Sequence, residues 1–432
     1  MPRHFRDYAA ILALLGSLTG CSVMPAPDPT DVIGSSAARV ASPGVTLDEA
    51  RIPTADAVRQ QLVPLLSEVS EPLSPAECAC LAAAQSSTAS ALEREAAHLR
   101  RQANLHGRHA SSDLLPSILE DQARKQRNDA AEQALVAYFQ LAEVQLQQEL
   151  LVESFRTQQQ TQETVDGLIR AGIPLDIDRT ELDRQRYALD KSGLQLGYDQ
   201  ARAIGQLKAL IGADPISHEV IRADCELAPR GPEYGLQEAI EIGHANDVQL
   251  RALGRFLNRG DVDDLGVARS LLQTANPMMG QEPASLGVLA KLLVICGHNP
   301  RGDEELAVRR RQVQELYDAR SQQVDLEVAK AVLNAQQRYY DVGVAHDVLA
   351  SRESREAFVE SNREAQKSGY SELIAARSER LKARSELLHA LIELEIAHVR
   401  VKAALGLLGQ ECAALTQDAN GVTPARRIHR CR

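Results

Sequence analysis

The chain has 432 residues, and the part beyond its N-terminal region is too long for one compact core, so two domains or one elongated body are expected. It contains no tryptophan, and aromatic residues make up only 3% of it, a composition typical of long helices that pack through small side chains. The net charge of −11, without an extended basic segment, argues against nucleic acid as a partner.

The N-terminus has the features of a segment that is removed on export. Two arginines precede an apolar stretch over residues 8–20, which at roughly 13 residues is shorter than the ~20 needed to span a bilayer. The stretch ends in Leu-Thr-Gly-Cys, which resembles the bacterial lipobox, where the cysteine is acylated before cleavage. We therefore expect a signal peptide over residues 1–20 and a covalent lipid on Cys21, with no other cofactor. An ordinary signal peptide with a coincidental cysteine is the alternative.

The residues after the cysteine favour a lipid-anchored protein on the periplasmic face of the outer membrane. Ser22 stands where many such lipoproteins carry the aspartate that marks retention in the inner membrane. Residues 21–45 are rich in Pro, Gly, Ser and Ala and show no apolar period, so we expect a flexible tether.

Two halves of the remaining chain repeat the same order of features at long period. In each half an alanine-containing helical segment is followed by a leucine pair and a proline, and then by a very long helical pattern. These patterns cover residues 118–171 and 304–368, and they break at Gly172 and Gly369. Each break predicts the tip of a helical hairpin.

The second helix of each predicted hairpin ends at another glycine, Gly212 in the first half and Gly409 in the second. The equal spacing predicts two tandem helical repeats, 46–230 with its tip near residue 172 and 231–410 with its tip near residue 369. Residues 411–432 are expected to form a disordered C-terminal tail.

The long patterns have the narrow apolar seam of a coiled coil. In the first of them the apolar positions recur every three or four residues: Leu135, Tyr138, Ala142, Leu146 and Leu150. A helix of about 50 residues is roughly 75 Å long, so it needs a partner along its length, from its own hairpin or from another subunit. The predicted fold class is all-α, with long antiparallel helical hairpins that are duplicated in tandem and coiled-coil-like.

The cysteines that come after Cys21 lack the spacing of a zinc site. They are Cys78, Cys80, Cys225, Cys296, Cys412 and Cys431. On a helix the side chains of Cys78 and Cys80 point about 200° apart, so we interpret the cysteines as small buried apolar residues. A Cys412–Cys431 or Cys78–Cys225 disulfide is the alternative in an oxidising periplasm.

No enzyme activity and no metal site are expected. The sequence contains no Gly-rich phosphate loop, nucleophile elbow or His-Glu-x-x-His pattern. The histidines are scattered, and the nearest pair that can share a helix face, His106 and His109, has no third ligand nearby.

With these features the sequence resembles the TolC-like outer-membrane efflux proteins, especially the lipid-anchored branch that works with proton-driven pumps. Residues 170–182 are similar to the hairpin tip of that family, and residues 207–215 resemble its closing Leu-Leu-Gly element. Weaker counterparts occur at 368–374 and 404–409. The resemblance covers residues 73–409.

The resemblance implies a homotrimer whose hairpins close a periplasmic tube, with tips that contact a periplasmic adaptor and, through it, an inner-membrane pump. The corresponding tip residues are Gly172, Ile173, Pro174, Asp176, Asp178, Gly369, Tyr370 and Ser371. The glycines have a physical reason, because a helix that ends in a tight reversal favours a left-handed residue. The aspartates sit where the next helix begins and can satisfy its free amides. Turn chemistry alone, without adaptor contact, is the alternative interpretation of the same residues.

The sequence departs from the family where membrane strands are expected. After Pro116 it passes directly into polar helical sequence, which leaves no room for two strands of ~9–11 residues. In the second half, residues 284–296 are almost continuously apolar but lack strand alternation and are too short to span as a helix. We interpret them as a buried or interfacial helix, with a membrane-dipping segment as the alternative. The resemblance thus predicts a TolC-like α-barrel protomer with a missing or vestigial β-barrel.

The sequence supports two hypotheses for function. The first is a TolC-like outer-membrane lipoprotein component of a tripartite efflux system, barrel-less and therefore not a pore by itself. The second is a periplasmic coiled-coil scaffolding lipoprotein with no transport role.

Overall fold

A computed structural model describes residues 72–105, 113–172, 179–217, 220–275, 300–364 and 369–412. Within these ranges the chain is helical, and its β-structure is limited to one isolated parallel bridge between Leu73 and Ala223. The predicted all-α class is therefore confirmed. None of the helices in the described ranges combines the length and the apolarity that a membrane span requires.

The chain forms two compact units, and each is described by itself. The smaller unit contains residues 259–316, with a 3₁₀ turn at Val262–Asp264, helix α9 at Leu265–Ala275 and the start of helix α11. Arg269 holds it together by donating from Nε and Nη2 to the Glu305 carboxylate at 2.9 and 2.7 Å.

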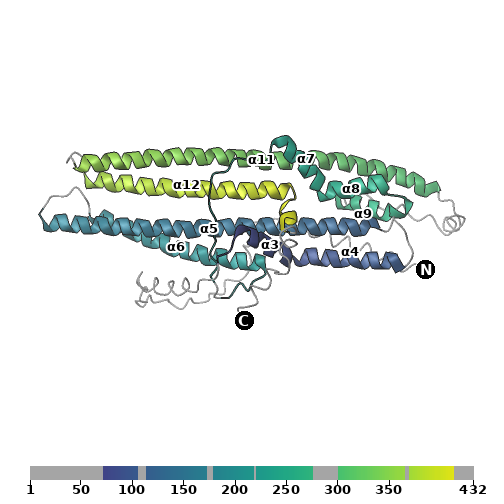
Figure 1. Cartoon of the computed structure of the whole chain (residues 1–432), viewed down its shortest axis with the longest axis horizontal. Helices are drawn as coiled ribbons and strands as arrows, with labels where there is room; N and C mark the ends of the chain where they lie inside the picture. The colour runs from purple at the N-terminus through teal and green to yellow at the C-terminus, as the bar shows by residue number, and fades with distance from the viewer. Residues whose placement is uncertain are drawn as a thin grey trace, which may run out of the picture. The chain divides into compact units, whose positions relative to one another are not determined.

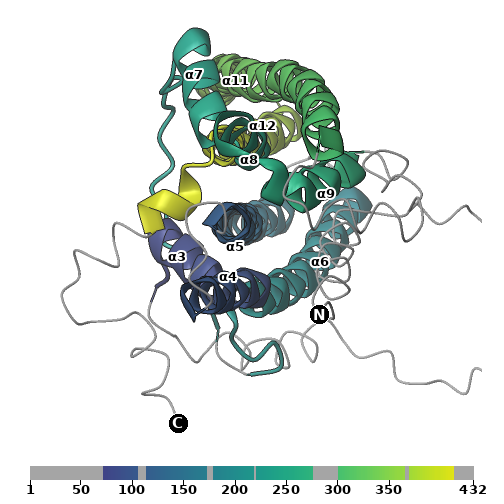
Figure 2. The same ribbon diagram turned by 90° about the vertical axis from the view of Figure 1, so that its right-hand side faces the viewer.

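The larger unit is built on two helical hairpins. In the first, α5 (Leu114–Arg170) is followed by α6 (Arg179–Ile211); in the second, α11 (Pro300–Glu364) is followed by α12 (Tyr370–Ala404). The long helices begin and end within a few residues of the predicted positions. In Figure 1 the rods of this unit lie in the order α11, α12, α5 and α6; end-on, in Figure 2, the row bends at α5, with α6 to its side.

Polar and apolar contacts between neighbours hold this row of helices together. Gln158 on α5 donates to the carbonyl of Leu182 on α6 at 3.0 Å. Arg384 on α12 donates to Glu153 on α5 at 2.6 Å, which joins the two hairpins. Between α11 and α12, one small cluster of buried side chains lies near the hairpin tip: Val359, Leu373 and Ala376.

Two shorter helices, α3 (Pro75–Gln85) and α4 (Ser87–Leu105), pack on α5. A capping box starts α3: the Ser74 hydroxyl accepts from the amide of Glu77 at 3.3 Å, and the Glu77 carboxylate accepts from the amide of Ser74 at 3.1 Å. Such reciprocal caps satisfy amides that have no partner in the first turn. The sequence therefore fixes where α3 begins.

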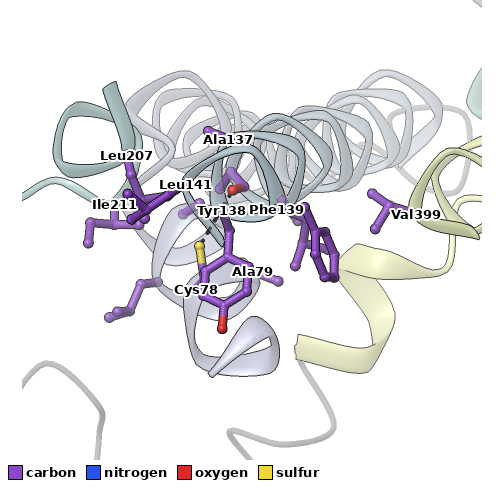
Figure 3. Close-up of a cluster of buried hydrophobic side chains, with 14 of the residues drawn as sticks. Cys78, Ala79, Ala137, Tyr138, Phe139, Leu141, Leu207, Ile211 and Val399 are labelled. Carbon is purple, nitrogen blue, oxygen red and sulfur yellow. Dashed lines mark hydrogen bonds between the residues drawn. The ribbon is translucent and has the colours of Figure 1, made fainter. Parts of the chain in front are cut away.

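The main core lies where α3, α5, α6 and α12 meet, around the fully buried ring of Tyr138 (Figure 3). The Tyr138 hydroxyl donates to the carbonyl of Leu73 at 2.8 Å, and the Cys78 thiol donates to the carbonyl of Ala134 at 3.6 Å. As predicted, Cys78 is buried. The structure contains no disulfide at Cys78, Cys80, Cys225 or Cys412.

Two further helices, α7 (Leu236–Asn246) and α8 (Val248–Arg259), belong to the larger unit up to residue 258. Gly243 allows α7 to approach α11 closely, because a Cβ at this position would lie 2.8 Å from Cγ2 of Val328. Glycine is therefore required here by packing, since its φ is not in the left-handed region.

The ends of the second helices agree with the sequence in one hairpin and differ in the other. Gly212 follows α6 directly with φ +75°, as expected for a left-handed residue that ends a helix. In the second hairpin α12 ends at Ala404 and the left-handed residue is Gly406, with φ +68°, so the predicted end at Gly409 is wrong. Gly409 instead lies in a short helical segment, 408–412, which extends into the region predicted to be tail.

Candidate functional site

The first hairpin tip begins with the left-handed glycine that the sequence predicted. Gly172 has φ +73°, and its amide donates to the carbonyl of Ile169 at 3.0 Å, which closes the end of α5. Four of the predicted tip residues lie outside the described residues: Ile173, Pro174, Asp176 and Asp178.

The second tip differs in its conformation. Gly369 has φ −82° and ψ 163°, so the left-handed conformation expected there is wrong. It is the N-cap of α12, and a residue that precedes a helix adopts extended backbone, whereas the left-handed conformation belongs to helix ends. Tyr370 and Ser371 are the first residues of α12, and the Arg363 guanidinium lies 5.1 Å from the centre of the Tyr370 ring. This cation–π contact joins α11 to α12 at the tip.

The two glycines should respond differently to the same substitution. At either position an added Cβ would meet no atom within 4 Å, so only the backbone conformation matters. We expect Gly172→Ala to lower the free energy of unfolding by about 1–2 kcal/mol, the penalty of a left-handed residue with a side chain. Gly369→Ala should change it by much less, since its φ is open to any residue. Urea unfolding of the two variants, followed by circular dichroism, tests the difference; equal losses would contradict it.

An apolar face of α11 is exposed to solvent. Six side chains on it, each 38–69% exposed, are Leu326, Leu333, Tyr340, Val344, Val348 and Phe358. At about 100° per residue, all six directions fall within an arc of roughly 80°. The positions on the opposite side of the helix are buried in the larger unit: Val324, Val328, Ala335 and Val342. We call the six exposed side chains the α11 stripe.

A second exposed apolar face lies on α6. Tyr187, Leu194 and Tyr198 are 71%, 40% and 68% exposed, and their spacing of seven and four residues places them on one side of the helix. We call these three side chains the α6 stripe. The buried side of α6 contains Leu182 and Leu207 and faces the rest of the unit.

The two stripes occupy opposite ends of the row of helices, because α11 and α6 are its outer members (Figure 2). Large exposed apolar faces of this kind mark surfaces that contact another protein or a membrane. The length of the helices predicted partners along them but did not identify these residues. The repeat of seven from Leu326 to Leu333 to Tyr340 was the available signal.

A charged cavity of about 290 Å³ lies in the larger unit, lined by residues of α5, α7, α8, α11 and α12. One of its lining residues is Asp121 on α5, whose carboxylate is fully buried. Three guanidiniums surround this carboxylate, with nearest N–O distances of 2.6 Å for Arg124, 3.2 Å for Arg251 and 2.6 Å for Arg255. The sequence did not predict this network, because its members come from segments far apart in the chain.

The network places more positive than negative charge next to Asp121. Burial lowers the pKa of Arg251, and Arg124 and Arg255 act in the same direction, while Asp121 opposes them. Across the ranges that the structure describes, no three His, Cys, Asp or Glu side chains converge as metal ligands. The arrangement is therefore best explained as a structural connection between α5 and α8.

A half-buried histidine makes the stability of the larger unit depend on pH. Burial lowers the pKa of His398 below its usual 6.5, with Lys402 and Arg230 acting in the same direction and Glu233 opposing. As the pH falls below 6.5, the imidazole of His398 binds a proton in the unfolded chain before it does so in the folded chain. The free energy of unfolding therefore decreases as the pH falls.

We expect His398→Gln to remove this part of the pH dependence, measured as the change in urea midpoint between pH 7.5 and 6. The exposed His346 on α11 provides the matched control, His346→Gln. The comparison stops at pH 6 because burial raises the pKa values of Glu132 and Glu395. At lower pH the protonation of these two carboxyl groups stabilises the folded chain and would mask the effect of His398. A wild-type midpoint that rises as the pH falls to 6 would contradict the assignment.

The fold is shared with solved membrane proteins of low sequence identity. The open state of the MtrE outer membrane channel of Neisseria gonorrhoeae is similar over 77% of this chain and 88% of its own, with a TM-score of 0.53 and 11% identity. The CmeC outer membrane channel of Campylobacter jejuni covers 73% of this chain and 71% of its own, with a TM-score of 0.50 and 10% identity. A membrane protein from Pseudomonas aeruginosa covers 68% and 71%, with a TM-score of 0.50 and 14% identity.

The sequence itself matches no protein-family profile and no curated protein. The structural likeness establishes the fold, which is that of the TolC-like helical protomer predicted from the sequence. The three similar structures named above are described as outer membrane channels or as a membrane protein.

Proposed function

We propose that this chain is a TolC-like outer-membrane lipoprotein component of a tripartite efflux system, in which several copies close a periplasmic helical tube. The observation that carries the proposal is the pair of exposed apolar stripes at the two ends of one row of helices. A fold shared with outer-membrane channels supports it.

The two stripes differ from each other, so they suit a head-to-tail contact between copies. The α11 stripe of one copy packs on the α6 stripe of the next, and such heterologous contacts close into a ring when the rotation between copies allows it. The resemblance to the TolC-like family favours three copies. The tandem repeats, 46–230 and 231–410, each supply one hairpin to the wall of this tube.

The hairpin tips provide the surface for a periplasmic adaptor, and the adaptor connects the tube to an inner-membrane pump. The tip residues in this proposal are those named from the sequence: Gly172, Ile173, Pro174, Asp176, Asp178, Gly369, Tyr370 and Ser371. Two of them, Asp176 and Asp178, carry carboxylates.

A lipid on Cys21 holds the assembly at the periplasmic face of the outer membrane. Two or three acyl chains anchor stably because each buried methylene contributes about 0.8 kcal/mol. Metabolic labelling with a palmitate analogue should mark the wild type and not Cys21→Ala, which should also leave the membrane fraction. A labelled Cys21→Ala chain would contradict the anchor.

The tube is proposed to lack its own membrane strands. In the first half, α4 ends at Leu105 and α5 begins at Leu114, and this connection is too short for two strands of ~9–11 residues. Reconstituted into lipid bilayers, the chain should therefore show no stable conductance. An ion-conducting pore would overturn this part of the proposal.

The same short connection favours the second candidate, a periplasmic scaffolding lipoprotein that assembles in the same way but has no transport role. Chemical cross-linking to the adaptor in cells separates the two. The double variant Asp176→Lys/Asp178→Lys should lose the cross-link, whereas Asp318→Lys, an equal charge change per site on α11 away from the tips, should keep it. If wild type shows no adaptor cross-link, the scaffold hypothesis stands and the efflux hypothesis falls.

Sedimentation velocity of the purified mature chain tests the architecture itself. We expect an elongated trimer, because subunits built of long rods have high friction for their mass. A compact monomer would contradict both candidates.

A further inference from the structure

Three buried thiols from opposite ends of the described chain belong to the main core. Cys78 and Cys80 lie on α3, and Cys412 lies in the short helical segment 408–412 that comes after Gly406. Their side chains are 0%, 8% and 7% exposed, and all three belong to the same hydrophobic cluster. This contact brings the start of the body next to its end.

The three thiols have different partners. Cys78 points toward Tyr138 and donates to the carbonyl of Ala134 at 3.6 Å (Figure 3). Cys80, two residues later, points about 200° away from Cys78, and its thiol shares a hydrogen bond with the thiol of Cys412. Cys80 and Cys412 are therefore neighbouring thiols from two segments of the chain, with no disulfide between them in this structure.

The acidities of the thiols depend on these partners. The hydrogen bond from Cys412 lowers the pKa of Cys80, and the same bond, with burial, raises the pKa of Cys412. Burial raises the pKa of Cys78 to about 12 and that of Cys225 to about 11. The thiolate is the reactive form of cysteine, and Cys80 is the thiol whose pKa is lowered, by its hydrogen bond with Cys412.

The cluster does not have the composition of a metal site. Within the described ranges no three metal-ligating side chains converge. Two thiols in mutual contact without a third ligand fit a redox pair better than a metal centre.

We propose that Cys80 and Cys412 form a disulfide in the exported protein, which fastens the segment after α12 to α3. The proposal rests on the export that the proposed function requires, because disulfides persist in oxidising compartments. It differs from the two pairings that the sequence alone left open, Cys78–Cys225 and Cys412–Cys431.

The oxidant is a disulfide, RSSR, of the protein or glutathione type. The Cys80 thiolate attacks one of its sulfurs, which forms a mixed disulfide and releases RS⁻. The Cys412 thiol then loses its proton to RS⁻ and attacks the sulfur of Cys80, forming the Cys80–Cys412 bond and releasing the second RS⁻, which takes up the proton that Cys80 lost. In sum, two thiols and RSSR give one protein disulfide and two RSH. The bond requires the sulfurs to move to about 2.05 Å.

Segment 408–412 packs against the rest of the larger unit, with Gly409 close to the backbone of α5 at Asn128. Leu408 is buried, Gln410 donates to the side chain of Asn246 at 3.1 Å, and Glu411 pairs with Lys402 at 3.2 Å. Both thiols are buried, so an oxidant reaches them only when this part of the core opens locally. The disulfide would add a covalent bond to these non-covalent contacts.

The purified mature chain, equilibrated with oxidised glutathione, trapped by alkylation and digested with trypsin, tests the pairing by mass spectrometry. We expect the Cys412 peptide to be linked to the α3 peptide. Trypsin leaves Cys78 and Cys80 on one peptide, since neither lysine nor arginine lies between them. The variants Cys78→Ala and Cys80→Ala therefore assign the link, which should persist in the first and be lost in the second.

Three results would overturn the inference. They are a link that survives in Cys80→Ala, a Cys412–Cys431 peptide as the main product, and complete alkylation of both thiols in the oxidised wild type. The third result is obtained with the wild-type chain, so it does not depend on whether a variant folds.

Trapping with alkylating reagent in intact cells separates this inference from the proposed function. If the chain is found in the outer membrane and carries the link, both stand. If it is found there with Cys80 and Cys412 reduced, the inference fails and the proposed function is untouched. If fractionation places the chain in a reducing compartment while glutathione still links the pair in vitro, the proposed function fails and the preferred pairing of these two thiols holds.

Discussion

Replacing Leu333 and Tyr340 with glutamate is expected to convert the assembled protein into monomers. Both side chains belong to the α11 stripe and are more than half exposed in the single chain. If they are buried between copies, each loses about 1.5–3 kcal/mol of burial per contact, or about 3–6 kcal/mol together. That corresponds to roughly 10²- to 10⁴-fold weaker association, before any cost of placing carboxylates in an apolar interface.

Sedimentation velocity measures this change directly, and Ala350→Glu is the matched control. Ala350 is exposed on the same helix but lies outside the stripe, about 80° from Tyr340 and about 100° from Leu333 around the helix axis. The control should assemble like the wild type. Assembly of Leu333→Glu/Tyr340→Glu at wild-type concentrations would show that the α11 stripe is not the contact between copies.

A substitution in the α6 stripe gives a second, independent test of the contact between copies. Tyr198→Lys on α6 should weaken assembly in the same way, because the proposed contact joins α11 of one copy to α6 of the next. Combined with Tyr340→Glu, it should recover part of the association if the two positions approach each other, since opposite charges across an interface attract. Equal losses without any recovery would indicate that the two stripes bind different partners.

Replacing Asp121 with alanine is expected to give the largest loss of stability in the larger unit. Its carboxylate is fully buried and contacts Arg124, Arg251 and Arg255 at 2.6–3.2 Å. Removing one partner of a buried ion pair costs about 3–5 kcal/mol, because the remaining charges are left without compensation. Here three guanidiniums lose their shared anion, so we expect a loss of this size or more.

Asp129 provides the matched control for this substitution. It is also on α5 and pairs with Lys125 at 2.6 Å, but both side chains are substantially exposed to solvent. Exposed pairs of this kind contribute about 0.2–1 kcal/mol, so Asp129→Ala should be nearly neutral. Urea unfolding followed by circular dichroism compares the variants; similar losses for both would mean that the Asp121 network contributes no more than a surface pair.

The sequence predicted the long helices well because their signals are local. The apolar period and the glycines at 172 and 212 depend only on neighbouring residues, and both glycines have the left-handed conformation that was expected. Gly369 was assigned the same conformation because it occupies the equivalent place in the second half. It instead precedes a helix in extended conformation, so a shared position in a repeat did not fix the backbone.

Features that join distant segments were not predicted. The Asp121 network combines α5 with α8, and the thiol pair combines α3 with a segment that was expected to be disordered. No period or motif in a single sequence relates such positions. The α11 stripe was in principle readable from its spacing, but the same spacing is produced by a buried seam, and only the exposure of the side chains distinguishes the two.

Because the α11 stripe and the α6 stripe are different surfaces, mixtures of wild-type and variant subunits should behave in a particular way. A chain whose α11 stripe is disrupted by substitution can still bind a wild-type chain through its intact α6 stripe. It then occupies a place in a growing ring but cannot form the contact that closes the ring. A small fraction of such chains should therefore block the assembly of many wild-type chains, so that their expression beside the wild type has a dominant-negative effect. A chain ruined at both stripes should be harmless, because it never joins.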